Sequence, residues 1–199
     1  MKISLDKNLE NPNFEKSKEI SLRCFIAIDL SRECRQEIKK IQDLLKKNNL
    51  FLGRFTEPEN LHLTLKFLGG ISEEQILEVK KRLNEIKMPE LHCEIGEIGV
   101  FSKSLAKIIW VRLNGKGIFE LQKQIDQKLL GLFEKEKRFM SHITIARVKN
   151  VPDKPSFFEY FRSIRPKPIK FSVKSFVLKK SELFLEGPTY TDLEEFYFG

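Results

Sequence analysis

The strongest constraint on the fold is a short strand pattern that the chain contains twice. Residues 61–67 read LHLTLKF and residues 141–147 read SHITIAR, so each segment holds a His followed two positions later by a Thr in an apolar run. Two of the three histidines in the chain occupy this pattern, 80 positions apart (142 − 62). The repetition predicts a fold built from two similar halves.

The segments around the two strands also repeat in order. An apolar run at 22–30 predicts a buried strand, and Ser31 after it can cap a helix. Ser72 with Gln75 forms a capping box for a second helix. Each half reads helix, His-Thr strand, helix, strand, strand. This order predicts an α+β fold with two pseudo-symmetric lobes, each a mostly antiparallel sheet with flanking helices, and an active cleft between the lobes.

The ends of the chain and its cysteines suggest how the protein is organised. Residues 1–20 are polar and lack a hydrophobic period, so we expect a flexible N-terminal extension, followed by a single bilobal domain over 21–199. No signal-peptide core and no run of 18 apolar residues is present, and the three cysteines show no C-x-x-C spacing. These features predict a soluble cytoplasmic protein without a membrane partner.

Alternation along a strand predicts which side chains of the first pattern share a face. The core face of 61–67 is predicted to hold Leu61, Leu63, Leu65 and Phe67. This leaves His62, Thr64 and Lys66 on the opposite face. The first strand therefore presents an imidazole and a hydroxyl, with Lys66 as a candidate substrate contact that could equally be solvated.

The second pattern follows the same rule, with one difficulty at its end. Ile143 and Ile145 are predicted to face the core, while His142 and Thr144 point the other way. Strict alternation places Arg147 on the core side. A role for Arg147 beside the His-Thr pair therefore requires the strand to end or twist at that point.

Two imidazoles and two hydroxyls in one cleft suit phosphoryl chemistry that needs no metal. Because His titrates near neutrality, one imidazole can take a proton from water while a protonated partner gives one to the leaving oxygen. The stiff Thr side chains can donate hydrogen bonds to phosphate oxygens, and Arg147 could neutralise the developing charge.

Other features leave the alternatives open. The chain carries 36 Lys and Arg against 28 Asp and Glu, a formal charge of +8, which attracts polyanions but explains solubility equally well. His92 has no Thr two positions later, so we interpret it as structural. A zinc site would need all three histidines to converge, and no local ligand spacing supports it.

Four segments, read together, give the chain a family resemblance. FIAIDL, PENLHLTLKFLG, HITIARV and SEL…EGPTY, within residues 22–198, resemble the RNA 2′,3′-cyclic phosphodiesterases (the LigT/ThpR group, also called 2′-5′ RNA ligases) of the two-histidine phosphoesterase superfamily. The resemblance implies a bilobal α+β fold and metal-independent hydrolysis of a terminal 2′,3′-cyclic phosphate to a 2′-phosphomonoester. In some members it also implies joining of RNA ends through a 2′-5′ linkage.

The resemblance assigns roles to the repeated residues. It implies that His62 donates a proton to the leaving 3′-oxygen and that His142 activates water. It also implies that Thr64, Thr144 and Arg147 bind the phosphate. Two departures from the family pattern are the extra residues 1–20 and Ser141, where many relatives have Pro.

Three functions remain compatible with the sequence. The first is an RNA end-processing hydrolase whose partner is an RNA with a cyclic phosphate end, tRNA-derived fragments included. The second keeps the chemistry but acts on small cyclic nucleotides, and the third binds RNA ends without turnover. We expect no cofactor and no metal, and the sequence gives no sign of an obligate protein partner.

Overall fold

The computed structural model describes residues 21–102, 106–185 and 187–199, so the predicted extension at 1–20 lies outside the described residues. The elements in chain order are β1 (Leu22–Asp29), α1 (Arg32–Asn48), β2 (Leu52–Phe55), the 3₁₀ turn η1 (Pro58–Asn60), β3 (His62–Ile71), α2 (Glu73–Leu83), β4 (Leu91–Phe101), β5 (Ile108–Gly115), α3 (Ile118–Lys128), β6 (His142–Asn150), α4 (Lys154–Ser163), β7 (Lys170–Val173), β8 (Ser175–Phe184) and β9 (Gly187–Tyr197).

The strands form one antiparallel sheet in the order β7-β4-β5-β6-β3-β1-β8-β9. The short strand β2 pairs with residues 146–150 of β6, beyond the point where β3 pairs with β6. The order is symmetric about the β3–β6 junction: β5 flanks β6 as β1 flanks β3, and β4 and β8 come next. The predicted α+β class, its antiparallel pairing and its two related halves are confirmed. The two predicted sheets are continuous, joined where Leu63 pairs with Ile143.

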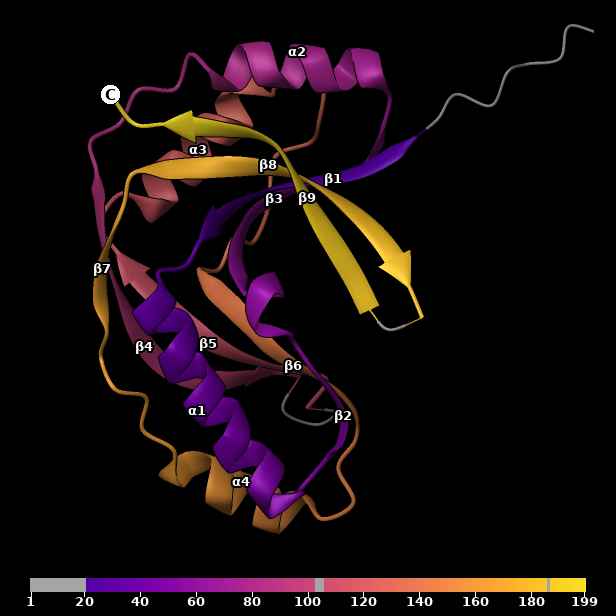
Figure 1. Ribbon diagram of the computed structural model, residues 1–199, viewed down its shortest axis with the longest axis vertical. Coiled ribbons are helices and arrows are strands. Elements are labelled where there is room, and N and C mark those ends of the chain that lie inside the picture. Colours follow the sequence, from indigo (N-terminus) through magenta and orange to yellow (C-terminus); the bar gives the residue numbers. More distant parts are fainter. Residues whose placement is uncertain (1–20, 103–105, 186) are drawn as a thin grey trace, which may run out of the picture.

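The helices begin where the sequence places their caps and cover the two halves separately. Ser31 accepts a hydrogen bond from the backbone N–H of Cys34 at the start of α1, and Ser72 with Gln75 forms the predicted capping box of α2. In Figure 1, α1 and α4 lie at one end of the molecule and α2 and α3 at the other. None of the helices in the described part of the chain is long and apolar enough to cross a membrane.

Both His-Thr strands contain a β-bulge at the same position. In β3 the partner register passes from Thr64 to Lys66 and leaves Leu65 unpaired; in β6 it passes from Thr144 to Ala146 in the same way. One extra residue shifts every following side chain to the other face of the sheet. The alternation predicted from the sequence therefore holds only as far as Leu65 and Ile145, which are buried as predicted.

The bulge in β3 overturns two predicted positions. Phe67, expected in the core, has 70% of its surface exposed, whereas Lys66, expected beside His62 and Thr64, is only 4% exposed. The Lys66 ammonium donates hydrogen bonds to Asp126 Oδ1 (2.6 Å) and to the backbone carbonyl of Glu134 (2.5 Å). The prediction that Lys66 shares the face of His62 and Thr64 is therefore wrong, because the bulge turns its side chain toward α3, and its role as a substrate contact stays a prediction.

The equivalent bulge in β6 resolves the difficulty with Arg147. Ile145 and Ala146 are both fully buried, and Arg147 is exposed. The strand does twist where a role for Arg147 required it to. Arg147 thus returns to the face of His142 and Thr144, and Phe67 is its counterpart in the first half.

Candidate active site

The junction of β3 and β6 brings the two His-Thr pairs together. Leu63 and Ile143 are directly paired in antiparallel register, and both are fully buried. Their neighbours on either side face away from the core, and in this register each His lies opposite a Thr of the other strand. These four side chains are His62, Thr64, His142 and Thr144. The convergence expected from the sequence is thus a consequence of strand pairing.

The imidazole of His62 is held by two hydrogen bonds that define its tautomer. Its Nδ1 lies 2.8 Å from the backbone carbonyl of Asn60, which can only accept, so Nδ1 carries the hydrogen. Its Nε2 lies 3.0 Å from Thr64 Oγ1 and accepts from that hydroxyl in the neutral ring. The ring therefore turns Nε2 toward the Thr64 side of the site.

His142 is oriented by the same device in the second half. Its Nδ1 donates to the backbone carbonyl of Met140 at 2.7 Å, again two residues before the His. Phe101 packs edge-on against the ring, with centroids 4.9 Å apart. Because both rings donate from Nδ1 to the protein, proton transfer falls to Nε2 in each ring, and in His62 this atom also accepts from Thr64.

Burial makes both imidazoles harder to protonate. Desolvation lowers the pKa of His62 to about 4; the Asn60 carbonyl and Asp29 oppose this, and Lys179 and Arg35 add to it. Burial also lowers the pKa of His142, with Arg112 adding to the shift and the Met140 carbonyl opposing it. In the free protein both rings are therefore predominantly neutral at pH 7.

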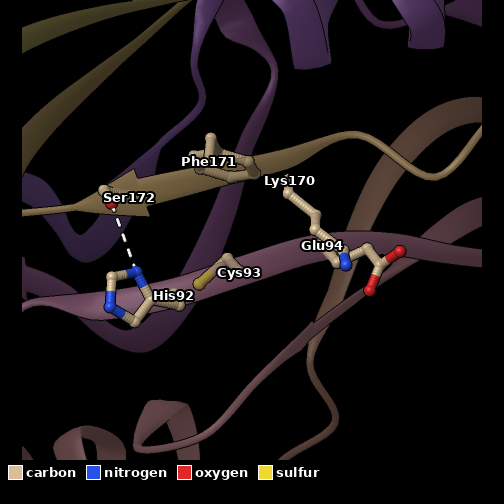
Figure 2. Close-up of a pocket in the computed structure, with 6 residues that line it drawn as sticks. All are labelled: His92, Cys93, Glu94, Lys170, Phe171 and Ser172. Atoms are coloured by element: carbon tan, nitrogen blue, oxygen red, sulfur yellow. Dashed lines mark hydrogen bonds between the residues drawn. The ribbon is translucent and has the colours of Figure 1, made fainter.

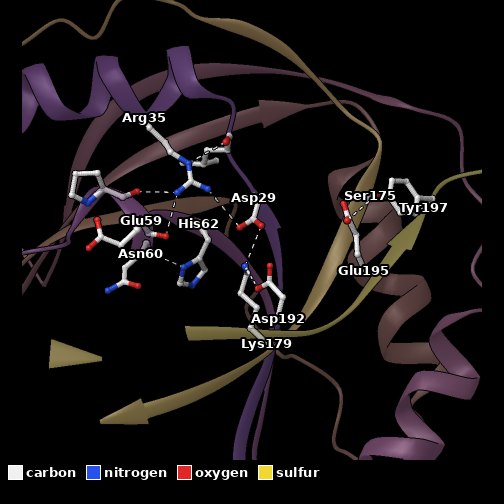
Figure 3. A network of polar contacts seen from close by, with 12 residues as sticks. Asp29, Arg35, Glu59, Asn60, His62, Ser175, Lys179, Asp192, Glu195 and Tyr197 are labelled. Atoms are coloured by element: carbon white, nitrogen blue, oxygen red, sulfur yellow. Dashed lines mark hydrogen bonds and ion pairs between the residues drawn. The ribbon is translucent and has the colours of Figure 1, made fainter. Parts of the chain in front are cut away.

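The two histidines differ in the charged residue that pairs with them across the sheet. Asp29 of β1 lies opposite His62, and Arg112 of β5 lies opposite His142 at the equivalent position. Asp29 also forms an ion pair with Lys179 at 3.1 Å, within the polar network that surrounds His62 in Figure 3. A carboxylate favours the protonated imidazole and a guanidinium favours the neutral one.

Aromatic residues beside His62 complete this side of the site, and none of them was among the predicted site residues. Tyr190 lies edge-on to His62 with centroids 5.3 Å apart, and Phe25 packs against both rings. Burial raises the pKa of Tyr190, and the charges of Arg147 and Arg23 oppose this. Tyr190 belongs to the EGPTY segment, whose part in the family resemblance was the signal that could have pointed to it.

His92 takes no part in this arrangement. It lies on β4, which β5 separates from β6, and Ser172 of β7 lies within hydrogen-bond distance of its Nδ1 (3.3 Å). Figure 2 shows it in a pocket on the β4–β7 edge with Cys93, Glu94, Lys170 and Phe171. Within the described ranges, no three His, Cys, Asp or Glu residues are grouped as metal ligands.

A duplicated antiparallel sheet that carries one His-x-Thr pair from each half on a single face is the arrangement of the two-histidine phosphoesterases. The model of the LigT like Phosphoesterase family matches two consecutive segments of the chain, residues 28–110 and 112–190, each of which contains one His-Thr strand. The chain belongs to this family.

Individual relatives agree with this assignment. The RNA 2′,3′-cyclic phosphodiesterase of Methanocaldococcus jannaschii is 33% identical over 87% of this chain and 99% of its own length. That of Thermotoga maritima is 31% identical over 89% of this chain and 96% of its own length. The crystal structure of E. coli LigT in its apo form superposes with a TM-score of 0.73 over 89% of this chain and 98% of that chain; at 24% identity it supports the fold.

Proposed function

We propose that this protein hydrolyses RNA 2′,3′-cyclic phosphate ends to 2′-phosphomonoesters, with His62 as general acid and His142 as general base. The single observation that carries the proposal is the Leu63–Ile143 register, which places both His-Thr pairs on one face of the sheet. The names of the M. jannaschii and T. maritima relatives support this substrate class.

The proposed reaction is a displacement at phosphorus between the two imidazoles. His142 Nε2 takes a proton from water, whose oxygen attacks the phosphorus while the bond from phosphorus to the 3′-oxygen breaks. His62 Nε2 gives its proton to that 3′-oxygen, and the phosphate stays on the 2′-oxygen. Thr64 and Thr144 donate hydrogen bonds to the non-bridging oxygens.

Arg147 and Phe67 occupy equivalent positions in the two halves but offer different chemistry. Both are exposed on the site face after the bulge of their strand. A guanidinium there can pair with phosphate oxygens, whereas an aromatic ring can contact a nucleobase. The proposed substrate therefore has its phosphate between the two imidazoles, within reach of Arg147 from the β6 side, and a base on the β3 side.

Anion binding should raise the pKa of His62. The free imidazole has a pKa of about 4, which is too low for a general acid at neutral pH. An anion placed between the rings favours the protonated form, so sulfate, which does not titrate in this range, should move the His62 pKa upward. NMR titration of the three histidines with and without sulfate measures this; equal shifts at His62 and His92 would indicate simple screening and contradict the proposal.

The substrate and metal requirement can be tested in one assay. An oligoribonucleotide with a 2′,3′-cyclic phosphate end, incubated with the protein in EDTA, should yield only the 2′-phosphomonoester. Loss of activity in EDTA would contradict the metal-independent mechanism. Binding without product would favour an RNA-end-binding module.

Two further comparisons refine the function. Faster turnover of a cyclic mononucleotide than of the RNA would favour a small-molecule substrate, whereas steep salt dependence with RNA would favour a role for the +8 net charge. A second RNA with a 5′-hydroxyl end tests for 2′-5′ joining. We place this activity in the reducing cytoplasm, since all three cysteines are buried and unpaired.

A further inference from the structure

We propose that Arg35 is a positioning residue for His62: it holds the turn whose carbonyl orients the catalytic imidazole. The proposal rests on the role proposed above for His62. Asn60, the last residue of η1, accepts the His62 Nδ1 hydrogen bond through its backbone carbonyl. The position of this turn therefore decides where Nε2 points.

The guanidinium of Arg35 binds the turn through successive backbone carbonyls. From α1, its Nη1 donates to the carbonyls of Pro58 (3.0 Å) and Glu59 (3.2 Å), and its Nε donates to that of Leu30 (3.1 Å), as seen in Figure 3. The planar fork thus joins the end of β1, the start of α1 and η1. With the Asn60 carbonyl taken by His62, a donor is in place on each carbonyl of the turn.

The turn has little else to fix it from within. It is three residues long, its N-cap residue makes no side-chain hydrogen bond, and its first residue is Pro58, which has no N–H to donate. One hydrogen bond within the turn is short, from the Asn60 N–H to the Glu57 carbonyl at 2.9 Å, but the closing one from the Leu61 N–H to the Pro58 carbonyl is long, at 3.4 Å. A single short turn of this kind needs an external partner to hold one geometry.

The second half holds the equivalent carbonyl by different means. Ser141 follows Met140, whose carbonyl orients His142, and Ser141 is fixed to Leu113 of β5 from both sides. Its hydroxyl donates to the Leu113 carbonyl, and its own carbonyl accepts from the Leu113 N–H. A hydroxyl and a strand partner therefore do for His142 what the guanidinium of Arg35 does for His62.

The same turn also helps to position Tyr190, which packs against His62. The Asn60 side chain donates to the Pro188 carbonyl at 2.8 Å, which ties η1 to the β8–β9 hairpin that carries Tyr190. The Asp29 carboxylate forms an ion pair with the Arg35 guanidinium at 3.8 Å. Loss of Arg35 should therefore release both the His62 carbonyl partner and the hairpin contact.

The test compares Arg35→Ala and Arg35→Lys with a control on the same helix. A displacement of about 1 Å can cost about 100-fold in rate, so both variants should lower kcat by about that factor with a much smaller change in KM. Lys keeps the charge but cannot bridge three carbonyls, so it should not rescue. Lys39→Ala, which removes an exposed ion pair with Asp43, should leave kcat unchanged.

A second readout separates positioning from general destabilisation. Nitrogen NMR shifts should show His62 as the Nδ1–H tautomer in the wild type and as a tautomer mixture in Arg35→Ala, with His142 unchanged. A His62 that keeps its tautomer, or full activity in Arg35→Lys, would overturn the proposal. If the wild type lacks cyclic phosphodiesterase activity, the proposed function fails, and the tautomer measurement still decides whether Arg35 orients His62.

Discussion

Replacing His142 with Ala should lower kcat on a cyclic-phosphate RNA by about 10²- to 10⁴-fold, and replacing His62 should do the same. Each variant removes one proton-transfer group from a displacement that needs both. KM should change much less, because Thr64, Thr144 and Arg147 remain to bind the phosphate. The double variant should be far less damaging than the product of the two single effects, since the imidazoles act in one transition state.

His92→Ala is the matched control, because it removes the third imidazole of the chain from an exposed site on β4. Its kcat should equal that of the wild type. Steady-state kinetics of the four variants, with thermal unfolding to check their folding, measures the effect. Full activity in either His62→Ala or His142→Ala would refute two-histidine catalysis in this protein.

Much of this architecture could be predicted because the sequence contains the same pattern of elements twice. A single His-x-Thr strand is weak information, but two in the same sequence of elements imply two equivalent halves. Sheet symmetry then brings the two strands to neighbouring positions. In the structure, the pairing of Leu63 with Ile143 joins the two strands. Helix starts at Ser31 and Ser72 were equally accessible, because capping is decided by a few adjacent residues.

The bulges could not be predicted because they depend on the neighbouring strand. Alternation is a local rule, and nothing in LHLTLKF itself marks Leu65 as unpaired. The consequence was two wrong positions, those of Lys66 and Phe67. Strict alternation also placed Arg147 on the wrong face, but that error could be noticed from the sequence, because a guanidinium is poorly suited to a core. A Lys on the predicted site face raised no such conflict.

The charges around the histidines were also beyond local analysis. Asp29 and Arg35 come from β1 and α1, and Lys179 comes from β8, 117 residues after His62 (179 − 62). Their effect on the His62 pKa depends on packing that brings these elements together. The acid and base roles therefore rest on resemblance, and the positions of Asp29 and Arg112 opposite His62 and His142 are compatible with them.

Lys66→Ala should lower the free energy of unfolding by about 3–5 kcal/mol, the typical cost of removing one partner of a buried ion pair. Asp126 is 6% exposed and would keep its charge without the ammonium, and the Glu134 carbonyl would lose its donor. Urea denaturation at neutral pH measures the loss. The equivalent position of the second half is Ala146, so the smaller side chain itself is compatible with the bulged strand.

The dependence of this loss on pH gives it a specific signature. Burial raises the pKa of Asp126, but hydrogen bonds from Lys66, Gln122 and the Glu136 N–H outweigh it, so the net pKa lies below the usual value. A depressed carboxyl pKa stabilises the fold above the unfolded-state pKa, and this contribution disappears as the pH falls through the folded-state value. The difference in the free energy of unfolding between the wild type and Lys66→Ala should therefore become smaller at acid pH.

Two further variants decide between a structural Lys66 and a substrate contact. Lys137→Ala, which removes an exposed partner of Glu134 in the same loop, should change stability by less than about 1 kcal/mol. Lys66→Met combined with Asp126→Leu should recover much of the stability, because apolar side chains can replace a buried ion pair. A Lys66→Ala protein of wild-type stability but strongly raised KM would instead return Lys66 to the substrate site, which its burial against α3 argues against.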